Sequence, residues 1–269
     1  MSLAKRKLGK TGLEVSCLGL GTVKIGRNQD VKYPSGFSLP SDEEVSTLFG
    51  QAKELGINFL DTAPAYGSSE QRLGRLLKER QDWIICSKVG EEFTAGKSYF
   101  DFSAKHTQHS IERSLRDIGT DYLDIVLIHS DGQDTKILES SDCPETLLRL
   151  KEKGLIKAVG MSTKTVDGGM KAAEILDLVM VTYNPSMQDD SVVIDHALAL
   201  EKGVLVKKAL NSGHDCLAVE TNKNTVSTNS INFTERNLRF ALDKEGVTSV
   251  IVGTINPQHL KENVEAVKQ

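Results

Sequence analysis

The sequence has few of the features that mark secreted, membrane-spanning or nucleic-acid-binding proteins. Its four cysteines lie far apart without metal-ligand spacing, and no secretory signal peptide is evident, so we expect reduced thiols and a cytoplasmic protein. No apolar stretch approaches the roughly 20 residues that a membrane-spanning helix requires. The net charge of −4 leaves no basic surplus for nucleic-acid phosphates. The composition therefore predicts a soluble protein that binds neither membranes nor nucleic acid. The cysteines are Cys17, Cys86, Cys143 and Cys216.

A short motif that recurs along the chain predicts alternating helices and strands. It combines lysine and acidic residues with a glycine and then apolar residues, at 53–57, 151–155, 201–204 and 244–247, with a variant at 116–119. The glycine suits the left-handed conformation that ends many helices, and the lysines suit the negative end of the helix dipole. Each copy therefore predicts the end of a helix and the start of the next strand.

Eight strands and eight helices are predicted in alternation. The strands are expected near residues 17–21, 57–60, 83–87, 123–128, 156–160, 178–182, 204–207 and 249–252. The helices are expected near residues 42–55, 69–79, 104–118, 142–153, 164–175, 189–201, 230–244 and 257–267. A (β/α)₈ barrel commonly needs about 250 residues, which agrees with this chain. Because alternating units with right-handed crossovers close most naturally into a barrel, we predict one (β/α)₈ TIM-barrel domain over residues 1–269.

Loops and a hairpin mark the two ends of the predicted barrel. Residues 7–15 predict a β-hairpin around a Thr-Gly turn, which would close the N-terminal bottom of the barrel. The longest stretches without periodicity all follow strands, so they should lie on the C-terminal face and line a substrate pocket. These stretches are 24–40, 89–103, 129–141 and 211–228. One of them carries an aromatic cluster that either walls the pocket or anchors its loop: Phe93, Tyr99, Phe100 and Phe102.

Four polar side chains come at or just past the C-terminal ends of three predicted strands. They are Asp61, Tyr66, Lys88 and His129. A phenol ordinarily titrates near pH 10, and a nearby ammonium lowers such a pKa by about 1–3 units, so Lys88 could activate Tyr66 as a proton donor. Asp61 would hold Lys88 charged, and His129 could hydrogen-bond a carbonyl oxygen. These groups together predict an active site for acid–base chemistry.

Each of these residues also has an ordinary explanation when taken alone. A loop tyrosine usually packs, a lysine is usually solvated, a lone histidine is usually structural, and Asp61 with Thr62 could cap a turn. Four complementary polar groups at neighbouring strand ends are harder to explain as packing, because burying them costs several kcal/mol unless they pair. The combination therefore favours a functional site.

Three segments around these residues resemble the active-site signatures of the aldo-keto reductases. They are 60–67 with Ser69 and Glu70, 87–89, and 124–129, and the overall resemblance runs from Arg6 to about Val267. It implies hydride transfer from a nicotinamide cofactor to the carbonyl of a small-molecule aldehyde or ketone. Tyr66 would be the general acid, Lys88 and Asp61 its tuning pair, and His129 the orienting group.

The same resemblance implies a set of cofactor-binding residues. They are Gly21, Thr22, Asp61, Ser162, Thr163, Lys207, Leu210, Gly253, Thr254, His259, Glu262 and Asn263. NADPH is the cofactor that the family leads us to expect, and NADH stays open because the usual lysine and arginine for a 2′-phosphate fall on Gly253 and His259. A helix that starts behind Asn256 is expected to supply free backbone amides for a phosphate. Thr163, Met180 and Lys207 depart from the residues that the family usually places around the nicotinamide.

Two other functions and several properties stay open at this point. Lys88 could be the Schiff-base nucleophile of a carbon–carbon lyase, although a nearby Asp61 disfavours the neutral amine that this chemistry needs. A cofactor-binding sensor or regulatory protein with little turnover is the other alternative. His106 and His109 are expected to be surface residues, and no metal is expected. The short chain predicts trimmed loops and broad substrate selectivity, while substrate, oligomeric state and physiological direction are open.

Overall fold

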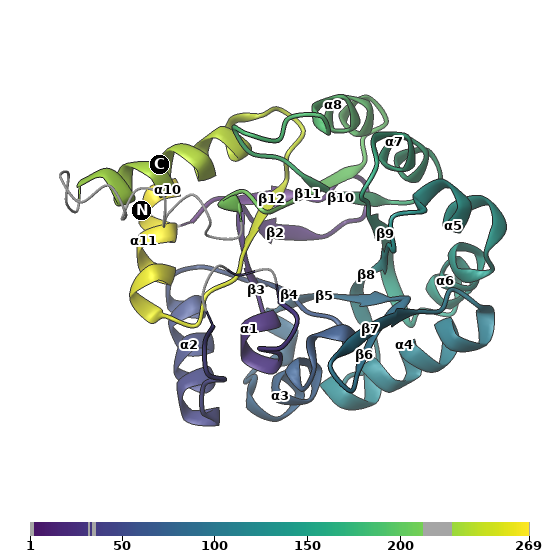
Figure 1. Ribbon diagram of the computed structural model, residues 1–269, viewed down its shortest axis with the longest axis horizontal. Coiled ribbons are helices and arrows are strands. Elements are labelled where there is room, and N and C mark those ends of the chain that lie inside the picture. The colour runs from purple at the N-terminus through teal and green to yellow at the C-terminus, as the bar shows by residue number, and fades with distance from the viewer. Residues whose placement is uncertain (1–2, 32, 34–35, 212–227, 269) are drawn as a thin grey trace.

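A closed barrel of parallel strands lies at the centre of the computed structural model, which describes residues 3–31, 33, 36–211 and 228–268. Among these residues the strands follow the order β10-β11-β12-β3-β4-β5-β8-β9 (Figure 1). The barrel strands are β3 (Leu18–Gly21), β4 (Phe59–Asp61), β5 (Ile84–Val89), β8 (Leu123–His129), β9 (Ile156–Ser162), β10 (Leu178–Thr182), β11 (Gly203–Lys207) and β12 (Ser249–Val252). The predicted (β/α)₈ TIM barrel is therefore confirmed.

Helices surround the barrel and lie between successive strands (Figure 1). They are α2 (Asp42–Glu54), α3 (Ser69–Leu76), α4 (Ala104–Ile118), α6 (Cys143–Glu152), α7 (Val166–Ile175), α8 (Ser191–Ala199), α10 (Thr228–Asp243) and α11 (Pro257–Val267). Local chemistry sets several of their ends: Ser41 and Glu44 form a capping box at the start of α2, and Gly119 takes φ 71° at the end of α4.

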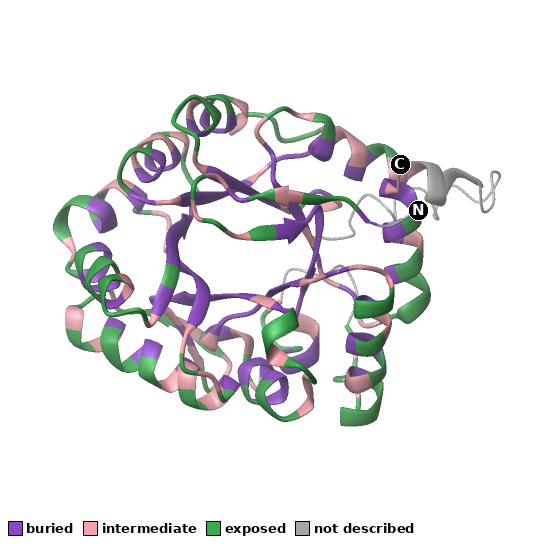
Figure 2. Cartoon of the chain, turned by 180° about the vertical axis from the view of Figure 1, so that it is seen from behind, coloured by how far each residue is buried: buried purple, intermediate pink, exposed green. Residues whose placement is uncertain are grey.

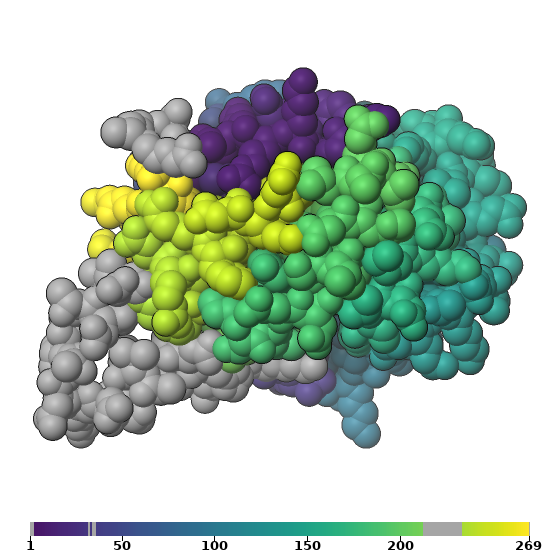
Figure 3. Space-filling view, turned by 90° about the horizontal axis from the view of Figure 1, so that it is seen from above, coloured from purple at the N-terminus to yellow at the C-terminus, as the bar shows by residue number. Residues whose placement is uncertain are grey.

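The barrel closes by pairing its first strand with its last. In β3 and β12, Leu18 lies opposite Val250 and Leu20 opposite Val252, in parallel register. Figure 3 shows the consequence on the surface, where the purple N-terminal segment lies against the yellow C-terminal segment. Since strand pairing joins residues more than 200 positions apart, the two ends of the chain depend on each other for their structure.

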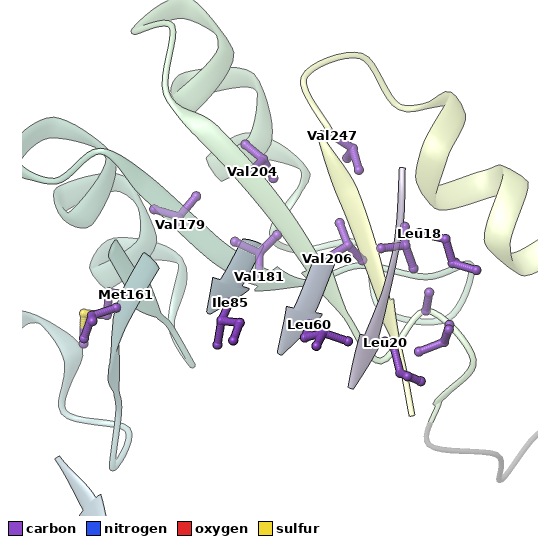
Figure 4. Packing of buried hydrophobic residues seen from close by; sticks show 14 of the residues in the cluster. Leu18, Leu20, Leu60, Ile85, Met161, Val179, Val181, Val204, Val206 and Val247 are labelled. Carbon is purple, nitrogen blue, oxygen red and sulfur yellow. The ribbon is translucent and has the colours of Figure 1, made fainter. Parts of the chain in front are cut away.

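Buried residues form two layers, one inside the barrel and one outside it. Figure 2 shows the buried strands at the centre and the exposed outer faces of the helices. The outer layer fills the space between strands and helices, and Figure 4 shows part of it, including Leu18, Leu60 and Val206. The inner layer contains the alternate residues of the same strands, such as Phe59 and Leu205. Away from the polar residues near their C-terminal ends, the strands are therefore largely apolar on both faces, as is typical of parallel sheets.

The predicted N-terminal hairpin closes the bottom of the barrel. Strand β1 (Lys5–Lys7) pairs antiparallel with β2 (Glu14–Ser16), and the Leu8 amide donates to the Leu13 carbonyl at 2.9 Å across the turn. Leu8 is fully buried and packs with the inner layer of the barrel. A side chain at Gly203, where β11 begins, would collide with Leu8 at 2.5 Å. The hairpin thus fills the N-terminal opening with an apolar side chain.

The structure differs from the prediction mainly in the loops and at element ends. The strand expected at 57–60 begins only at Phe59, because the Ile57 amide still donates to the Ala52 carbonyl at the end of α2. The helix expected at 69–79 ends at Leu76 because Leu77 is extended. Stretches expected to lack regular structure contain α1 (Val23–Gly26), the hairpin β6 (Glu91–Thr94) and β7 (Lys97–Phe100), and α5 (Asp134–Ser140). Most of the predicted loop 211–228 lies outside the described residues.

The remaining bulk expectations concern thiols and membranes. Cys17, Cys86 and Cys143 are free and buried, and Cys216 lies outside the described residues. Within the described part of the chain, no helix is both long enough and apolar enough to span a bilayer.

We predict that Leu8→Ala destabilises the protein by about 2–5 kcal/mol, because it leaves a cavity at the closed end of the barrel. The free energy of unfolding in urea measures this loss. Leu148→Ala is the matched control, since Leu148 is 36% exposed on α6 and should lose well under about 1 kcal/mol. Equal effects of the two substitutions would contradict the role of the hairpin.

Candidate active site

A cavity of about 1540 Å³ opens at the C-terminal ends of the barrel strands. Every barrel strand contributes to its lining, through Gly21, Asp61, Lys88, His129, Ser162, Thr182, Lys207 and Val252. The short helix α1 adds Lys24, the residue after it is Arg27, and the β6–β7 hairpin adds Glu91 and Phe100. The stretches that follow β3 and β5 therefore line the cavity, as the sequence predicts, and they do so with regular structure.

Asp61 and Lys88 form a buried ion pair at the floor of the cavity. Lys88 Nζ lies 2.5 Å from Asp61 Oδ1 and donates a second hydrogen bond to the Thr62 carbonyl at 2.9 Å. Lys88 is 1% exposed and Asp61 is 5% exposed. Burial alone would lower the pKa of the Lys88 ammonium, but Asp61 and Tyr66 raise it above its ordinary value. Lys88 is therefore held as a cation.

Tyr66 lies directly over this ion pair. Its ring centroid is 4.8 Å from Lys88 Nζ, on the 3₁₀ turn η1 (Pro64–Tyr66) that follows β4. Burial raises the pKa of the Tyr66 phenol strongly, whereas Lys88 lowers it. The prediction that Lys88 acts on the phenol is confirmed in direction. The pKa of the phenol nevertheless rises overall, because the loss of hydration outweighs the effect of the nearby cation.

Close backbone packing fixes the position of the Tyr66 turn. A side chain at Gly26 would lie 2.2 Å from the Tyr66 carbonyl oxygen, and Gly67 takes φ +63° directly after Tyr66. Arg27 donates to the Ala65 carbonyl at 3.0 Å. Glycine is thus required where α1 meets the turn, and Arg27 anchors the turn from the side.

His129 faces Tyr66 from the end of β8 and is paired with a carboxylate. The two rings meet edge to face with centroids 6.2 Å apart. His129 Nδ1 lies 2.9 Å from Glu91 Oε2 on β6. Burial lowers the pKa of His129 and outweighs the opposing effect of Glu91. Burial alone would raise the pKa of Glu91, but contacts with His129, Ser98 and Arg27 lower it to about 2.

A buried network of hydroxyl groups supports the strand ends beneath the site. Ser69 Oγ lies 2.7 Å from Thr22 Oγ1 and 2.9 Å from Thr62 Oγ1. Next to it, Glu70 accepts hydrogen bonds from Ser87 Oγ at 2.5 Å and Ser114 Oγ at 3.1 Å. Burial raises the pKa of Glu70 to about 7, despite these hydrogen bonds. The carboxyl is therefore partly protonated at neutral pH.

Lys207 lies at the end of β11 and lines the cavity. It donates to Ser162 Oγ at 2.8 Å and to the Thr163 carbonyl at 2.7 Å. Burial, together with Lys208, lowers the pKa of Lys207 to about 7. The Thr163 hydroxyl is buried beside the cavity and has no partner among the described residues, so it is free to bond a ligand. Met180 also lines the cavity and adds an apolar surface.

The far end of the cavity is formed by β12, α10 and α11. It is lined by Gly253, Thr254, His259, Glu262, Asn263 and Glu265, with Glu235 from α10. Asn256 Oδ1 accepts from the amides of Gln258 at 2.9 Å and His259 at 3.4 Å. The expectation of free backbone amides at this helix start is therefore wrong, because the Asn256 cap already satisfies them and Pro257 has no N–H.

The structure brings the predicted residues together, with one exception. Of the predicted catalytic and cofactor residues, only Thr22 does not line the cavity, because its hydroxyl donates to the Asp61 carbonyl at 2.9 Å and contacts Ser69. The sequence reasoning missed Glu91. It also assigned no role to Arg27 or to the carboxyl of Glu70. The only signal for Glu91 was its place in a loop after the Lys88 strand.

The aromatic cluster divides between the two roles considered for it. Phe100 lines the cavity, whereas Phe102 stacks on Phe100 with centroids 6.2 Å apart and packs toward the core. Phe93 lies under the Arg27 guanidinium at 3.5 Å, and Tyr99 is exposed.

The histidine His106, which was considered as a metal ligand, contacts Glu92 at 3.4 Å. Within the described ranges, no cluster of three or more His, Cys, Asp and Glu side chains could hold a metal ion.

Comparisons with known proteins agree on one family. A model described as the Aldo/keto reductase family matches residues 17–269. L-galactose dehydrogenase from Arabidopsis thaliana is 28% identical over 98% of this chain and 88% of its own length. Pyridoxine 4-dehydrogenase from Escherichia coli is 26% identical over 94% of this chain and 90% of its own length.

Solved structures of similar proteins have the same fold. A Pseudomonas aeruginosa protein assigned as an aldo-keto reductase is 48% identical, with a TM-score of 0.87, over 99% of this chain and 95% of that one. An aldo-keto reductase from Bacillus halodurans, in its holo form, is 25% identical with a TM-score of 0.81 over 99% of this chain and 91% of that one.

We predict that stability falls as pH rises from about 4.5 to about 7, because the folded state keeps a proton on Glu70 that the unfolded state has lost. The loss is of the order of 3 kcal/mol. Glu70→Gln mimics the protonated acid, so urea unfolding at pH 5 and pH 8 should show a smaller pH dependence and a more stable variant at pH 8. Glu43→Gln, on the exposed face of α2, is the control. An unchanged pH dependence in Glu70→Gln would rule out this proton.

Proposed function

The chain belongs to the aldo/keto reductase family, and we propose that it is an NAD(P)H-dependent oxidoreductase that reduces an aldehyde or ketone to an alcohol. The observation that carries the proposal is the buried Asp61–Lys88 pair beneath Tyr66, with His129 beside it, at the mouth of the barrel. Active sites of TIM-barrel enzymes lie at this end. Four groups that are costly to bury are thus held together where a substrate can reach them.

The roles of the residues follow from their geometry. When bound, a reduced nicotinamide supplies the hydride to the carbonyl carbon. Tyr66 keeps its proton in the resting state and donates it to the substrate oxygen as negative charge develops there. Lys88, held as a cation by Asp61, stabilises the phenolate that forms. His129 lines the cavity beside Tyr66 and orients the same oxygen.

The lining of the cavity fits a dinucleotide. A volume of about 1540 Å³ exceeds the roughly 300–1,000 Å³ of a typical ligand pocket, so a cofactor and a small substrate can share it. The unpartnered Thr163 hydroxyl offers a hydrogen bond for a carboxamide. The other proposed cofactor contacts, among them Gly21, Ser162, Leu210 and Asn263, lie along one continuous lining.

Of the two alternatives, the lyase is the weaker. A Schiff-base nucleophile must be neutral, whereas Asp61 and Tyr66 raise the pKa of Lys88. A cofactor-binding sensor has one observation in its favour: Lys207 holds Ser162 and the Thr163 carbonyl where the family commonly places an aromatic ring.

We propose small hydroxylated aldehydes as a substrate class, since relatives include a dehydrogenase named for L-galactose. The proposed substrates are therefore small-molecule carbonyl compounds.

We predict that Tyr66→Phe lowers carbonyl reduction by about 10²–10⁴-fold, because it removes the proton donor and leaves the cavity shape unchanged. Steady-state rates over a panel of aldehydes measure the loss, and cofactor titration by fluorescence should stay within about twofold of the wild type. Tyr99→Phe is the matched control, since Tyr99 is 50% exposed on β7. A wild type that binds cofactor but reduces no carbonyl would favour the sensor.

We also predict that NADH binds at least as tightly as NADPH, although the family resemblance favours NADPH. By that resemblance the adenosine would lie against α11, where Glu262 and Glu265 line the cavity and would repel a 2′-phosphate. Calorimetric titration with both cofactors tests this preference. Glu262→Gln should strengthen NADPH binding about three- to tenfold and leave NADH binding no stronger. A wild type that binds NADPH much more tightly than NADH would contradict the prediction.

A further inference from the structure

We propose that Glu91 is a positioning residue for the imidazole of His129: it holds the proton on Nδ1 and favours the imidazolium, whose Nε2–H is a charged donor toward the reacting oxygen. The catalytic meaning of this assignment rests on the proposed function. Its structural content does not, because it concerns which nitrogen of His129 carries the proton. The observation behind it is the 2.9 Å ion-pair contact between His129 Nδ1 and Glu91 Oε2, in which the ring N–H is not well aligned with the oxygen, so the attraction is mainly electrostatic.

Glu91 is itself held in place by two further neighbours, Ser98 and Arg27. Ser98 Oγ donates to Glu91 Oε1 at 2.6 Å across the β6–β7 hairpin. Arg27 NH1 lies 3.7 Å from the same oxygen, and Arg27 also anchors the Tyr66 turn through the Ala65 carbonyl. Since Ser98 and Arg27 occupy Oε1, the other oxygen is left for His129. Arg27 thereby links the positions of the tyrosine turn and the histidine partner.

Charge decides which nitrogen of His129 bears the proton. With a pKa of about 2, Glu91 is ionised at neutral pH and can only accept a hydrogen bond. The Nδ1 atom must therefore carry the proton for this contact to be attractive. In the neutral imidazole, Nε2 is then an acceptor, on a side chain that lines the cavity. A second proton converts Nε2 into a donor toward a carbonyl oxygen.

The groups around His129 determine how readily that second proton is taken up. Lys88 on β5 and Lys207 on β11 oppose it, as does burial, whereas Glu91 on β6 favours it. Tyr66 on η1 faces the ring edge to face. Glu91 is therefore the one carboxylate in this set that stabilises the imidazolium. Without it, the imidazolium should become rarer, and the neutral Nε2–H tautomer that replaces it is an uncharged and weaker donor, which lowers the rate of a step that needs the imidazolium.

Long-range ¹H–¹⁵N NMR of the histidine side chains tests the assignment without any substrate. The signals of His129 are identified from their loss in His129→Gln. In the wild type at pH 8 we expect the Nδ1–H tautomer, and in Glu91→Ala we expect the Nε2–H tautomer that free imidazole prefers. Glu91→Gln keeps a hydrogen-bond acceptor without the charge, so the pKa of His129 should fall relative to the wild type.

Glu92→Gln is the matched control on the same strand. Glu92 contacts Arg113 and His106, away from His129, so its substitution perturbs the hairpin and should leave the His129 tautomer unchanged. In carbonyl reduction, Glu91→Ala should lower kcat about tenfold, with the KM of the cofactor nearly unchanged, because an uncharged donor replaces the imidazolium. A general disruption of the hairpin would lower kcat equally in Glu91→Ala and Glu92→Gln.

The outcomes separate this inference from the proposed function. A wild type with the proton on Nε2, or a Glu91→Ala variant that keeps the Nδ1–H tautomer, would overturn the role of Glu91. The wild-type spectrum alone decides this point if Glu91→Ala does not fold. The expected spectra in a protein that reduces no carbonyl compound would support the role of Glu91 and refute the reductase.

Discussion

The ion pair between Asp61 and Lys88 is the interaction on which the site depends. Both side chains are almost fully buried, and leaving either one unpaired in the barrel would cost several kcal/mol. The 2.5 Å contact between Lys88 Nζ and Asp61 Oδ1 fixes the ends of β4 and β5 relative to each other. The Thr62 carbonyl accepts a second hydrogen bond from Lys88. The Tyr66 ring therefore lies next to an ammonium group, that of Lys88, whose position the ion pair fixes.

The barrel can hold these charges because the rest of its interior is apolar and closed at the other end. Leu8 and the inner layer exclude water from below, so the polar groups are confined to the C-terminal mouth. A low local polarity strengthens every charge interaction there, and it also explains why the pKa values of Tyr66 and Glu70 rise while that of His129 falls. The burial that forms the apolar core therefore also shifts the pKa values of these groups.

A few further side chains around the mouth of the barrel complete the site. Lys207 donates hydrogen bonds to Ser162 Oγ and to the Thr163 carbonyl. Glu91 brings a carboxylate to His129 from the β6–β7 hairpin, and Arg27 ties that carboxylate to the turn carrying Tyr66. Lys207 and His129 belong to barrel strands, whereas Arg27 and Glu91 lie outside them, so the site combines fixed strand ends with residues of the surrounding segments.

The sequence by itself determined the barrel, its hairpin plug and the four polar groups at its mouth. Periodicity, helix-ending glycines and apolar runs are local, and the polarity of residues such as Asp61 and Lys88 at strand ends is visible in the chain. Only the tertiary structure decided the partner of His129, the net rise in the pKa of Tyr66 and the capped amides behind Asn256. The reason is physical: strand positions follow from short-range patterns, whereas hydrogen-bond partners and loss of hydration depend on residues far apart in the chain, as Glu91 and His129 are.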